Sequence, residues 1–474
     1  MKCIVVGGGF AGLAAATRLA EGGGDVTLIE KLPRLGGRAR SIVDESTGDI
    51  IDNGPRLVFG GCPSTRAFQA RIGARETLDF SADVRLAWCN RGRLVRFDRS
   101  SLDRLSTTFG VLAGLTRFQG FTLTERALAL RVPAALKLGD RLAAPAGDRE
   151  TVDEWLARLS QSAGARRAFW HPIAVAALND DPRTASAKLF ESALRESIFG
   201  DRKEVQPGVA KAGLSDLDCA SAERFLVERG AKVRLSTAVI ELILAGPDGE
   251  RHIGGVRLEG GERIDADTVI AALPPRPLLD LLPASLHGER GFAGIKRLGR
   301  SPIVSIHFWF DRLVTEEPLF GLLDSPIHWV FNRNRLGAVR DASRSALSLV
   351  IPAARALVGR ASEDLIALGL AELTRALPAV GKAKLVHARV LADPDATIAH
   401  PAGDELDRPR CRTAVGGLFL AGDYVRTGLP ATVESAVRSG DDAALLALIY
   451  EPPAPPPAPP GFVPIARLTR RAAT

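Results

Sequence analysis

The sequence predicts an α/β protein in which a parallel-sheet domain is interleaved with a second, α+β domain. Within residues 1–30, an apolar run, a glycine turn, an Ala/Leu-rich run and another apolar run follow one another, as in a strand–helix–strand unit. A further apolar run at 417–421 lies near the other end of the chain and ends in Gly-Asp. The residues between them alternate between helical and strand-like patterns. A sheet domain with parts at both ends therefore encloses the second domain.

The changes of pattern along the chain predict six segments. The parallel-sheet domain takes three of them, at 1–82, 205–275 and 400–450. The second domain takes a mostly helical segment at 83–204 and a segment of mixed sheet and helix at 276–399. The last segment, 451–474, opens with a run of prolines and alanines, which cannot join a core, so we expect a disordered tail.

The individual elements follow from hydrophobic periodicity and turn residues. Residues 2–6 and 26–30 are strand-length apolar runs, and 11–20 predicts a helix that ends at three glycines. Helical spacing predicts further helices at 102–115, 123–138, 152–159, 186–199, 365–377 and 432–448. Short apolar or alternating runs predict strands at 50–59, 233–244, 255–258, 268–273, 303–310, 345–351 and 417–421. The alternation in 303–310 places one set of side chains on a single face, namely Val304, Ile306, Phe308 and Phe310.

Composition and charge disfavour several classes of protein. Of the 474 residues, 46% are hydrophobic and 25% are charged, which is typical of globular proteins. The net charge of +7 comes without a basic run, so nucleic acid is not an expected partner. The five cysteines show no C-x-x-C spacing, which disfavours a metal site and a disulfide framework. No apolar stretch is long enough for a membrane span, and the predicted strand at residue 2 leaves no room for a signal peptide. We therefore expect a cytoplasmic protein, either free or resting on the inner face of the cell membrane.

The first motif is the run GGGFAG at 7–12, a G-x-G-x-x-G pattern between the first strand and the first helix. Gly7 permits a tight turn, Gly9 lets a pyrophosphate approach the backbone, and Gly12 lets helix and strand pack closely. The helix N-terminus offers amide groups and a positive dipole end to phosphates. Glu30, at the end of the second strand, can accept hydrogen bonds from an adenosine ribose. Together these features predict a dinucleotide-binding site.

Two more motifs can contribute to the same site. In Gly36-Gly37-Arg38, the glycine pair lets the chain approach a ligand closely, and Arg38 can pair with phosphate oxygens. The strand at 417–421 leads into Gly422-Asp423, which places a carboxylate at the carboxyl edge of the sheet. The run at 427–432 then opens the last helix, whose N-terminus can stabilise negative charge on a bound ring.

With these motifs, the chain resembles the FAD enzymes of the flavin amine oxidase and carotenoid desaturase superfamily. The resemblance narrows to the hydroxysqualene dehydroxylases, the squalene-associated FAD-dependent desaturases of bacterial hopanoid synthesis, and it extends as far as residue 450. Its more specific matches are Ala-Ala-Leu-Asn at 176–179 and Thr-Gly-Leu-Pro-Ala-Thr at 427–432. It implies a Rossmann-like FAD-binding domain of the glutathione-reductase-2 type. None of the five cysteines lies in the Gly-Asp segment, and Tyr424 is the nucleophile nearby, so we expect the FAD to be non-covalent.

The resemblance also assigns residues to the cofactor site. Carried over position by position, the implied FAD-binding residues are Gly7, Gly9, Phe10, Ala11, Gly12, Glu30, Lys31, Gly37, Arg38, Asn53, Gly54, Pro55, Arg56, Val239, Gly422, Asp423, Pro430, Ala431 and Thr432. Asp423 would hold the ribityl chain, and Val239 would contact adenine through its backbone. The chain departs from the expected pattern at Pro55-Arg56, where Gln-His is expected, and at Tyr424, where Trp is expected. Arg56 stays charged and cannot simply replace a proton-shuttling histidine, so the proton donor or the substrate can differ.

The implied reaction is the reductive removal of an allylic hydroxyl from hydroxysqualene, with a hydride from flavin N5, to give squalene. The candidates for a catalytic role are Arg56, His171, His307 and His328, each with a purely structural role as the alternative. A long-chain isoprenoid would need an apolar tunnel, which we expect from 105–138, with Phe109, Phe118 and Phe121, and from the strand segments 308–310 and 329–331. Residues 123–138 also fit a helix that lies on a lipid surface. The electron donor is not specified by the sequence.

Three alternatives remain open at this point. A phytoene-type carotenoid desaturase and an amine oxidase share the cofactor motifs, and a lipid-carrying escort protein shares the fold without redox chemistry. Amine oxidases build an aromatic cage over the flavin, whereas this chain has only two tyrosines. The presence of Glu30, Arg38 and Asp423 together argues against the escort protein.

Overall fold

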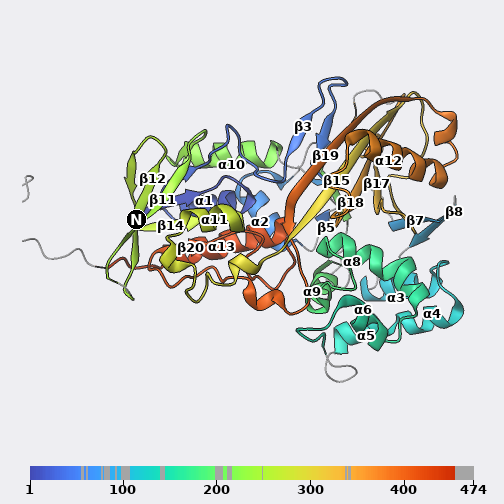
Figure 1. Ribbon diagram of the computed structural model, residues 1–474, viewed down its shortest axis with the longest axis horizontal. Helices are drawn as coiled ribbons and strands as arrows, with labels where there is room; N and C mark the ends of the chain where they lie inside the picture. The colour runs from blue at the N-terminus through green and yellow to red at the C-terminus, as the bar shows by residue number, and fades with distance from the viewer. Residues whose placement is uncertain are drawn as a thin grey trace, which may run out of the picture.

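The computed structural model describes residues 1–54, 58–59, 62–75, 78–79, 86–90, 93–97, 107–138, 145–197, 207–210, 216–247, 249–336, 339 and 343–453. Pro55, Arg56, the side chain of Phe109 and the proline-rich tail from residue 454 lie outside these described parts. Figure 1 shows two halves side by side, a sheet-and-helix half that holds the N-terminus and a second half in which a mixed sheet lies above a group of helices.

A parallel sheet organises the first half. In the described part of the chain its five strands, in spatial order, are β10 (Lys232–Arg234), β2 (Asp25–Ile29), β1 (Lys2–Val6), β14 (Thr268–Ala271) and β20 (Leu418–Leu420). Every neighbouring pair is parallel. Val6 pairs in register with Ile29 on one side and Ala271 on the other, so the carboxyl ends of the central strands meet at one edge. This arrangement confirms the predicted α/β fold class.

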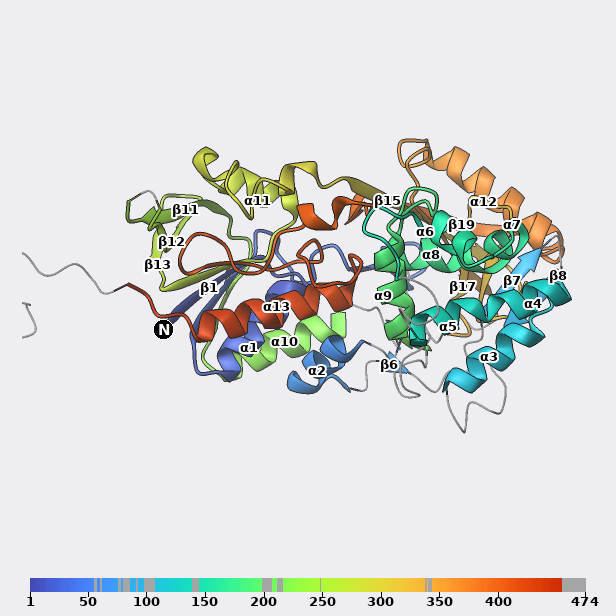
Figure 2. The same cartoon turned by 90° about the horizontal axis from the view of Figure 1, so that it is seen from below.

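Two layers cover this sheet because its strands are apolar on both faces, as parallel strands usually are. One face is covered by α1 (Phe10–Glu21), α2 (Pro63–Arg71), α10 (Asp216–Glu228) and α13 (Val433–Leu448). The other face is covered by the antiparallel strands β11 (Val239–Ala245), β12 (His252–Leu258) and β13 (Arg263–Asp265) together with α11 (Pro275–Leu281), as Figure 2 shows. Gly440 lets α13 lie against α1, since a Cβ there would come within 2.2 Å of the Ala11 carbonyl oxygen.

A second, mixed sheet organises the other half. Its seven described strands, in spatial order, are β19 (Leu385–Ile398), β15 (Arg300–Phe310), β18 (Ser345–Pro352), β17 (Trp329–Asn332), β16 (Leu319–Leu322), β7 (Leu86–Asn90) and β8 (Arg93–Phe97). The face that carries Phe308 and Phe310 packs with residues of α12 (Ser362–Ala376) in one hydrophobic core, which confirms the predicted alternation. We call the opposite face the inner face; on β15 it carries Ile303, Ser305, His307 and Trp309.

A group of helices shares a core with the inner face. They are α3 (Thr107–Arg117), α4 (Leu123–Ala129), α5 (Arg131–Leu138), α6 (Val152–Arg158), α7 (Ala163–Ala165), α8 (His171–Leu178) and α9 (Ala187–Ser197). Their core contains Phe118 and Phe121 together with Trp329 and Phe331 of β17. The remaining described strands are short, namely β3 (Ser41–Val43), β4 (Ile50–Asp52), β5 (Val58–Phe59), β6 (Leu78–Asp79) and β9 (Pro207–Ala210).

Two sequence predictions about this half were wrong in part. Phe308, Phe310 and Val330 were expected in the apolar tunnel, but they lie in the core on the α12 side, because strand side chains alternate between the two faces. The helix expected at 123–138 is two helices, α4 and α5, with Leu130 between them. Among the helices that are described, none is long and apolar enough to cross a membrane.

Candidate functional site

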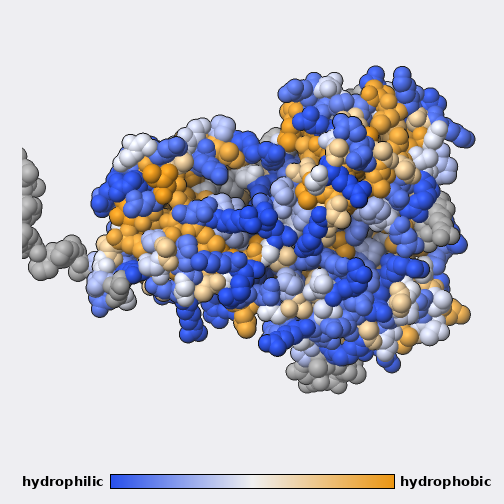
Figure 3. All heavy atoms as spheres, viewed as in Figure 1, coloured by the Kyte–Doolittle hydropathy of each residue, from blue (hydrophilic) through white to orange (hydrophobic). Residues whose placement is uncertain are grey.

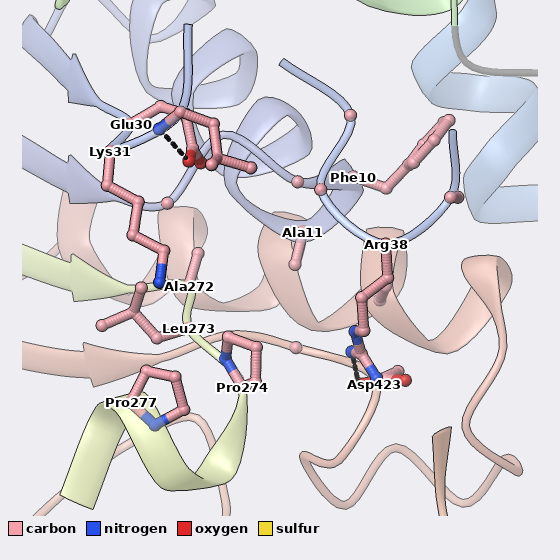
Figure 4. Close-up of a pocket in the computed structure, with 18 of the residues that line it drawn as sticks. Phe10, Ala11, Glu30, Lys31, Arg38, Ala272, Leu273, Pro274, Pro277 and Asp423 are labelled. Atoms are coloured by element: carbon pink, nitrogen blue, oxygen red, sulfur yellow. Dashed lines mark hydrogen bonds and ion pairs between the residues drawn. The ribbon is translucent and has the colours of Figure 1, made fainter. Parts of the chain in front are cut away.

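A cavity of about 650 Å³ opens at the carboxyl edge of the parallel sheet, where open α/β sheets bind their ligands. Its walls come from the glycine turn after β1, the residues after β2, the Ala272-Leu273-Pro274 turn after β14 and the loop after β20. Figure 4 shows Glu30 and Lys31 on one side of it and the Arg38–Asp423 pair on the other. The volume lies within the range of cofactor and small-molecule sites.

The three motif glycines of the turn have different roles. Gly7 has a φ of +106°, and a Cβ there would come within 2.4 Å of the Ala272 carbonyl oxygen. A Cβ at Gly12 would lie 1.8 Å from the Gly7 carbonyl oxygen, so this glycine is required for the packing of α1 on β1. At Gly9 a Cβ would meet only the Cα of Gly37, at 3.9 Å, and would otherwise occupy the cavity. Gly9 therefore leaves room for a ligand at the N-terminus of α1.

The carboxylate of Glu30 is buried and oriented by the backbone. One of its oxygens accepts a hydrogen bond from the Gly8 N–H at 2.7 Å, and the other accepts one from the Leu32 N–H at 2.9 Å. Each carboxylate oxygen has two acceptor positions, so each has one left for a hydroxyl group. This arrangement fits the expected contact between Glu30 and a ribose.

Arg38 and Asp423 join two walls of the cavity. An Nη atom of Arg38 lies 2.6 Å from a carboxylate oxygen of Asp423, and the other donates to the Ala396 carbonyl at 3.1 Å. Burial acts to lower the pKa of Arg38, but the charge and hydrogen bond of Asp423 outweigh it and raise the pKa. The contact between Arg38 and a phosphate that the sequence predicts stays a prediction; within the protein, the charged partner of Arg38 is Asp423.

Two buried side chains that were not predicted from the sequence form hydrogen bonds to the loop that carries Asp423. Neither of them lines the cavity. Arg408 donates five hydrogen bonds, one to Glu405 and the others to the carbonyl oxygens of Asp423, Tyr424, Val425 and Leu429. His400 accepts the Ala431 N–H on its Nε2 at 2.8 Å. Burial, together with the charge of Arg408, lowers the pKa of His400 to about 3, so the ring is neutral and can accept this bond.

We expect Arg408→Met to lower the flavin content of the purified protein. Of the four carbonyl groups of the Asp423 loop that Arg408 binds, the substitution leaves three without a donor among the described residues, and the fourth, of Asp423, keeps only the Ser435 hydroxyl at 3.4 Å. A lost partner for one buried group costs roughly 1–3 kcal/mol, so a loss of at least about tenfold in FAD affinity is expected. The measurement is the ratio of bound flavin to protein after gel filtration. Arg297→Met is the matched control, since Arg297 also pairs with a carboxylate, that of Asp407, but is exposed. Full flavin content in Arg408→Met would show that the loop does not need this support.

Most of the predicted cofactor residues line the cavity. They are Gly7, Gly9, Phe10, Ala11, Glu30, Lys31, Gly37, Arg38, Asn53, Val239, Gly422, Asp423, Ala431 and Thr432. Gly12, Gly54 and Pro430 are adjacent in sequence but do not line it, and Pro55 and Arg56 lie outside the described residues. Ala272, Leu273 and Pro274 also line the cavity and were not predicted from the sequence, although their position directly after a buried strand of the same sheet was a usable signal.

The three candidate histidines lie elsewhere. His171 pairs with Asp153 at 2.8 Å in the helical group, and burial lowers its pKa. His328 precedes β17, and burial lowers its pKa to about 4. His307 is fully buried on the inner face of the second sheet, where it bonds to Ser348. None of the three lines the cavity.

Comparison with known proteins places this geometry among flavin enzymes. The family model described as flavin containing amine oxidoreductase matches residues 10–448. The hydroxysqualene dehydroxylase of Sinorhizobium fredii is 30% identical over 446 residues, which cover 94% of this chain and 97% of that protein. The 15-cis-phytoene desaturase of Synechococcus elongatus is 26% identical, over 93% of this chain and 94% of that protein. Among solved structures, an oxidoreductase from Methanosarcina mazei superposes with a TM-score of 0.69 at 18% identity, covering 93% of this chain and 99% of that one.

Proposed function

Because the chain belongs to the family of flavin-containing amine oxidoreductases, we propose that this FAD-dependent oxidoreductase removes the hydroxyl of hydroxysqualene reductively to give squalene. The observation that carries the proposal is the similarity to named hydroxysqualene dehydroxylases along 94% of the chain. The relatives named phytoene desaturases are less similar but are also named for an isoprenoid substrate. Both groups of relatives therefore favour a long apolar substrate over an amine.

The residues around the cavity fit FAD, and their roles follow from their chemistry. Glu30 would accept hydrogen bonds from the hydroxyl groups of the adenosine ribose. The amide groups at the start of α1, beside Gly9, would bind the pyrophosphate. Asp423, fixed by Arg38 and Arg408, would accept hydrogen bonds from the ribityl hydroxyls. The N-terminus of α13, which is capped by Thr432, would lie near the ring and stabilise negative charge there.

The reaction needs two electrons and two protons, since R–OH becomes R–H and water. The hydride that replaces the hydroxyl would come from reduced FAD bound in the cavity. The protein has to orient the C–O bond toward the flavin, exclude water from an allylic centre that carries positive charge, and deliver a proton to the departing oxygen. The inner face of the second sheet is apolar apart from a few side chains, and it shares its core with the aromatic residues of the helical group.

The proposal is tested by product analysis. Holoenzyme that is kept reduced with dithionite under nitrogen is expected to convert hydroxysqualene, presented in detergent, to squalene that is identified by mass spectrometry. The apoprotein under the same conditions is the control for chemical reduction. A reduced holoenzyme that leaves hydroxysqualene unchanged, while the oxidised enzyme introduces double bonds into phytoene, would replace the proposal by the desaturase alternative.

We also expect FAD to be bound without a covalent link. Tyr424 is the nucleophilic side chain next to Asp423, but it is buried in the core on the β11–β13 side of the parallel sheet and does not line the cavity. Burial also raises the pKa of its hydroxyl. None of the five cysteines lines the described cavity. Precipitation with acid should therefore release all flavin into the supernatant, whereas flavin that stays in the pellet would contradict this prediction.

A further inference from the structure

Two polar side chains on the inner face of the second sheet are buried without using their hydrogen-bonding atoms. Ser305 and His307 alternate along β15, so both point to the same face, and they are 1% and 0% exposed. Among the residues that the structure describes, neither the Ser305 hydroxyl nor the His307 Nε2 atom has a hydrogen-bond partner. A buried polar atom without a partner costs roughly 1–3 kcal/mol, so a pair of them suggests that a ligand completes the site.

This pair lies near the edge of the FAD cavity. Ile303, two residues before Ser305 on the same face, pairs in register with Asp393, which lines the cavity. Gly54, which follows the cavity residue Asn53, lies beside Ile303, since a Cβ there would come within 3.8 Å of its side chain. A strand rises by about 3.3 Å per residue, so Ser305 is about 7 Å and His307 about 13 Å beyond Ile303.

The state of His307 restricts what it can bind. Its Nδ1 lies 2.8 Å from the Ser348 hydroxyl, on the neighbouring strand and directly opposite in register. Burial, with the positive charge of Arg333, lowers the pKa of His307 to about 3, so the ring is neutral at physiological pH. The Nε2 atom of this neutral ring can then donate or accept one hydrogen bond. A neutral hydroxyl group, which can do both, is a suitable partner for His307 and for Ser305.

The neighbours of Ser305 across the sheet are apolar, whereas His307 lies between Ser348 on β18 and Arg389 on β19. The strand register forms a row across the sheet. From Ser305 it runs through Val350, Trp329 and Gly321 to Trp88. Gly321 makes room for the large ring, because a Cβ there would lie 2.9 Å from Trp88. Leu391 of β19 flanks Ser305 on its other side, so Ser305 is the one polar member of an otherwise apolar row. A long hydrocarbon with one hydroxyl group has the same distribution of polarity.

We propose that Ser305 and His307 form the site that binds the hydroxyl of a long isoprenoid alcohol at the edge of the FAD cavity. Ser305, which is nearer to the cavity, fixes the oxygen, and His307, oriented by Ser348, completes its hydrogen bonds. The site would thereby select the alcohol over the hydrocarbon and orient the C–O bond. This inference rests on the proposed function, because it deepens the choice of substrate class.

The test compares the binding of hydroxysqualene and squalene to the oxidised holoprotein, in which no reductive turnover takes place. Both lipids are titrated in detergent, and the change in the flavin absorption spectrum reports binding. We expect the wild type to prefer the alcohol by about tenfold, which corresponds to one or two hydrogen bonds. Ser305→Ala and His307→Leu should lose this preference while squalene binds as before. His307→Gln, which keeps a hydrogen-bonding group near the Nε2 position, should retain most of it.

Ser345→Ala is the matched control. The Ser345 hydroxyl is also buried and has no partner within the described part of the chain, but Ser345 lies opposite Phe310 and therefore faces α12. Its removal should leave both affinities unchanged. An alcohol preference that persists in Ser305→Ala and in His307→Leu, with normal flavin content, overturns the site and leaves the proposed function intact. A wild type without any preference for the alcohol overturns the site and counts against the proposed function as well.

Discussion

Gly9→Val is expected to abolish FAD binding while the apoprotein stays folded. The backbone at Gly9 is extended, with a φ of −76° and a ψ of 178°, which valine adopts easily. A Cβ at this position makes only an ordinary contact, 3.9 Å from the Cα of Gly37, so the protein itself has room for it. The added methyl groups would fill the space in which a pyrophosphate must approach the N-terminus of α1. We expect a loss of flavin affinity of more than about 100-fold, or about 2.7 kcal/mol.

Two quantities are measured: the affinity of the apoprotein for FAD, from the quenching of flavin fluorescence, and the midpoint of the thermal unfolding of the apoprotein. Gly12→Val should lower both the FAD affinity and the thermal midpoint, because its Cβ would lie 1.8 Å from the Gly7 carbonyl oxygen. Gly288→Ala should change neither the FAD affinity nor the thermal midpoint, since no described atom lies within 4 Å of the added one. Stoichiometric flavin in purified Gly9→Val would show that the pyrophosphate does not bind at this turn.

Asp423→Ala is expected to lower FAD affinity by about 10- to 100-fold. A hydrogen bond to a charged group contributes roughly 1.5–3 kcal/mol, and the substitution also leaves the Arg38 guanidinium without its carboxylate partner. Asp423→Asn keeps an acceptor of the same shape without the charge, so its affinity should lie between those of the wild type and Asp423→Ala. FAD titration of the three apoproteins measures the series.

Glu30→Ala should weaken FAD binding to a similar extent, but at the opposite end of the cofactor. Competition by AMP against FAD separates the two carboxylates, because AMP carries only the adenosine end. AMP should compete less well in Glu30→Ala and as well as in the wild type in Asp423→Ala. If AMP competition fell equally in both variants, the proposed orientation of FAD in the cavity would be wrong.

The cofactor half could be predicted largely from the sequence, because its signals are local. The turn at 7–12, the acidic Glu30 and the Gly422-Asp423 pair each combine a residue type with a position at a strand end. In a parallel sheet all carboxyl ends meet at one edge, so these separate motifs converge without further information. The same rule applied to the strand at 268–271 would have found the Ala272-Leu273-Pro274 wall.

The residues that support the site could not be found in this way. Arg408 donates hydrogen bonds to backbone carbonyl groups, which every loop has. The sequence of the Asp423 loop therefore does not indicate that a buried arginine is its partner. His400 is likewise distant from Ala431 in the sequence. The tunnel prediction was wrong for Phe308 and Phe310, because it assigned consecutive aromatic residues of one strand to the same face. Neighbouring residues on a strand point to opposite faces of the sheet.

The direction of electron transfer tests the central claim most directly. Holoenzyme is photoreduced under nitrogen, hydroxysqualene is added, and the flavin spectrum is recorded while squalene is quantified. The proposed function predicts that the oxidised flavin spectrum returns and that one squalene forms for each flavin reoxidised, with squalene added alone as the inert control. A flavin that stays reduced with hydroxysqualene, but becomes reduced when the oxidised enzyme receives phytoene or an amine, would contradict the account.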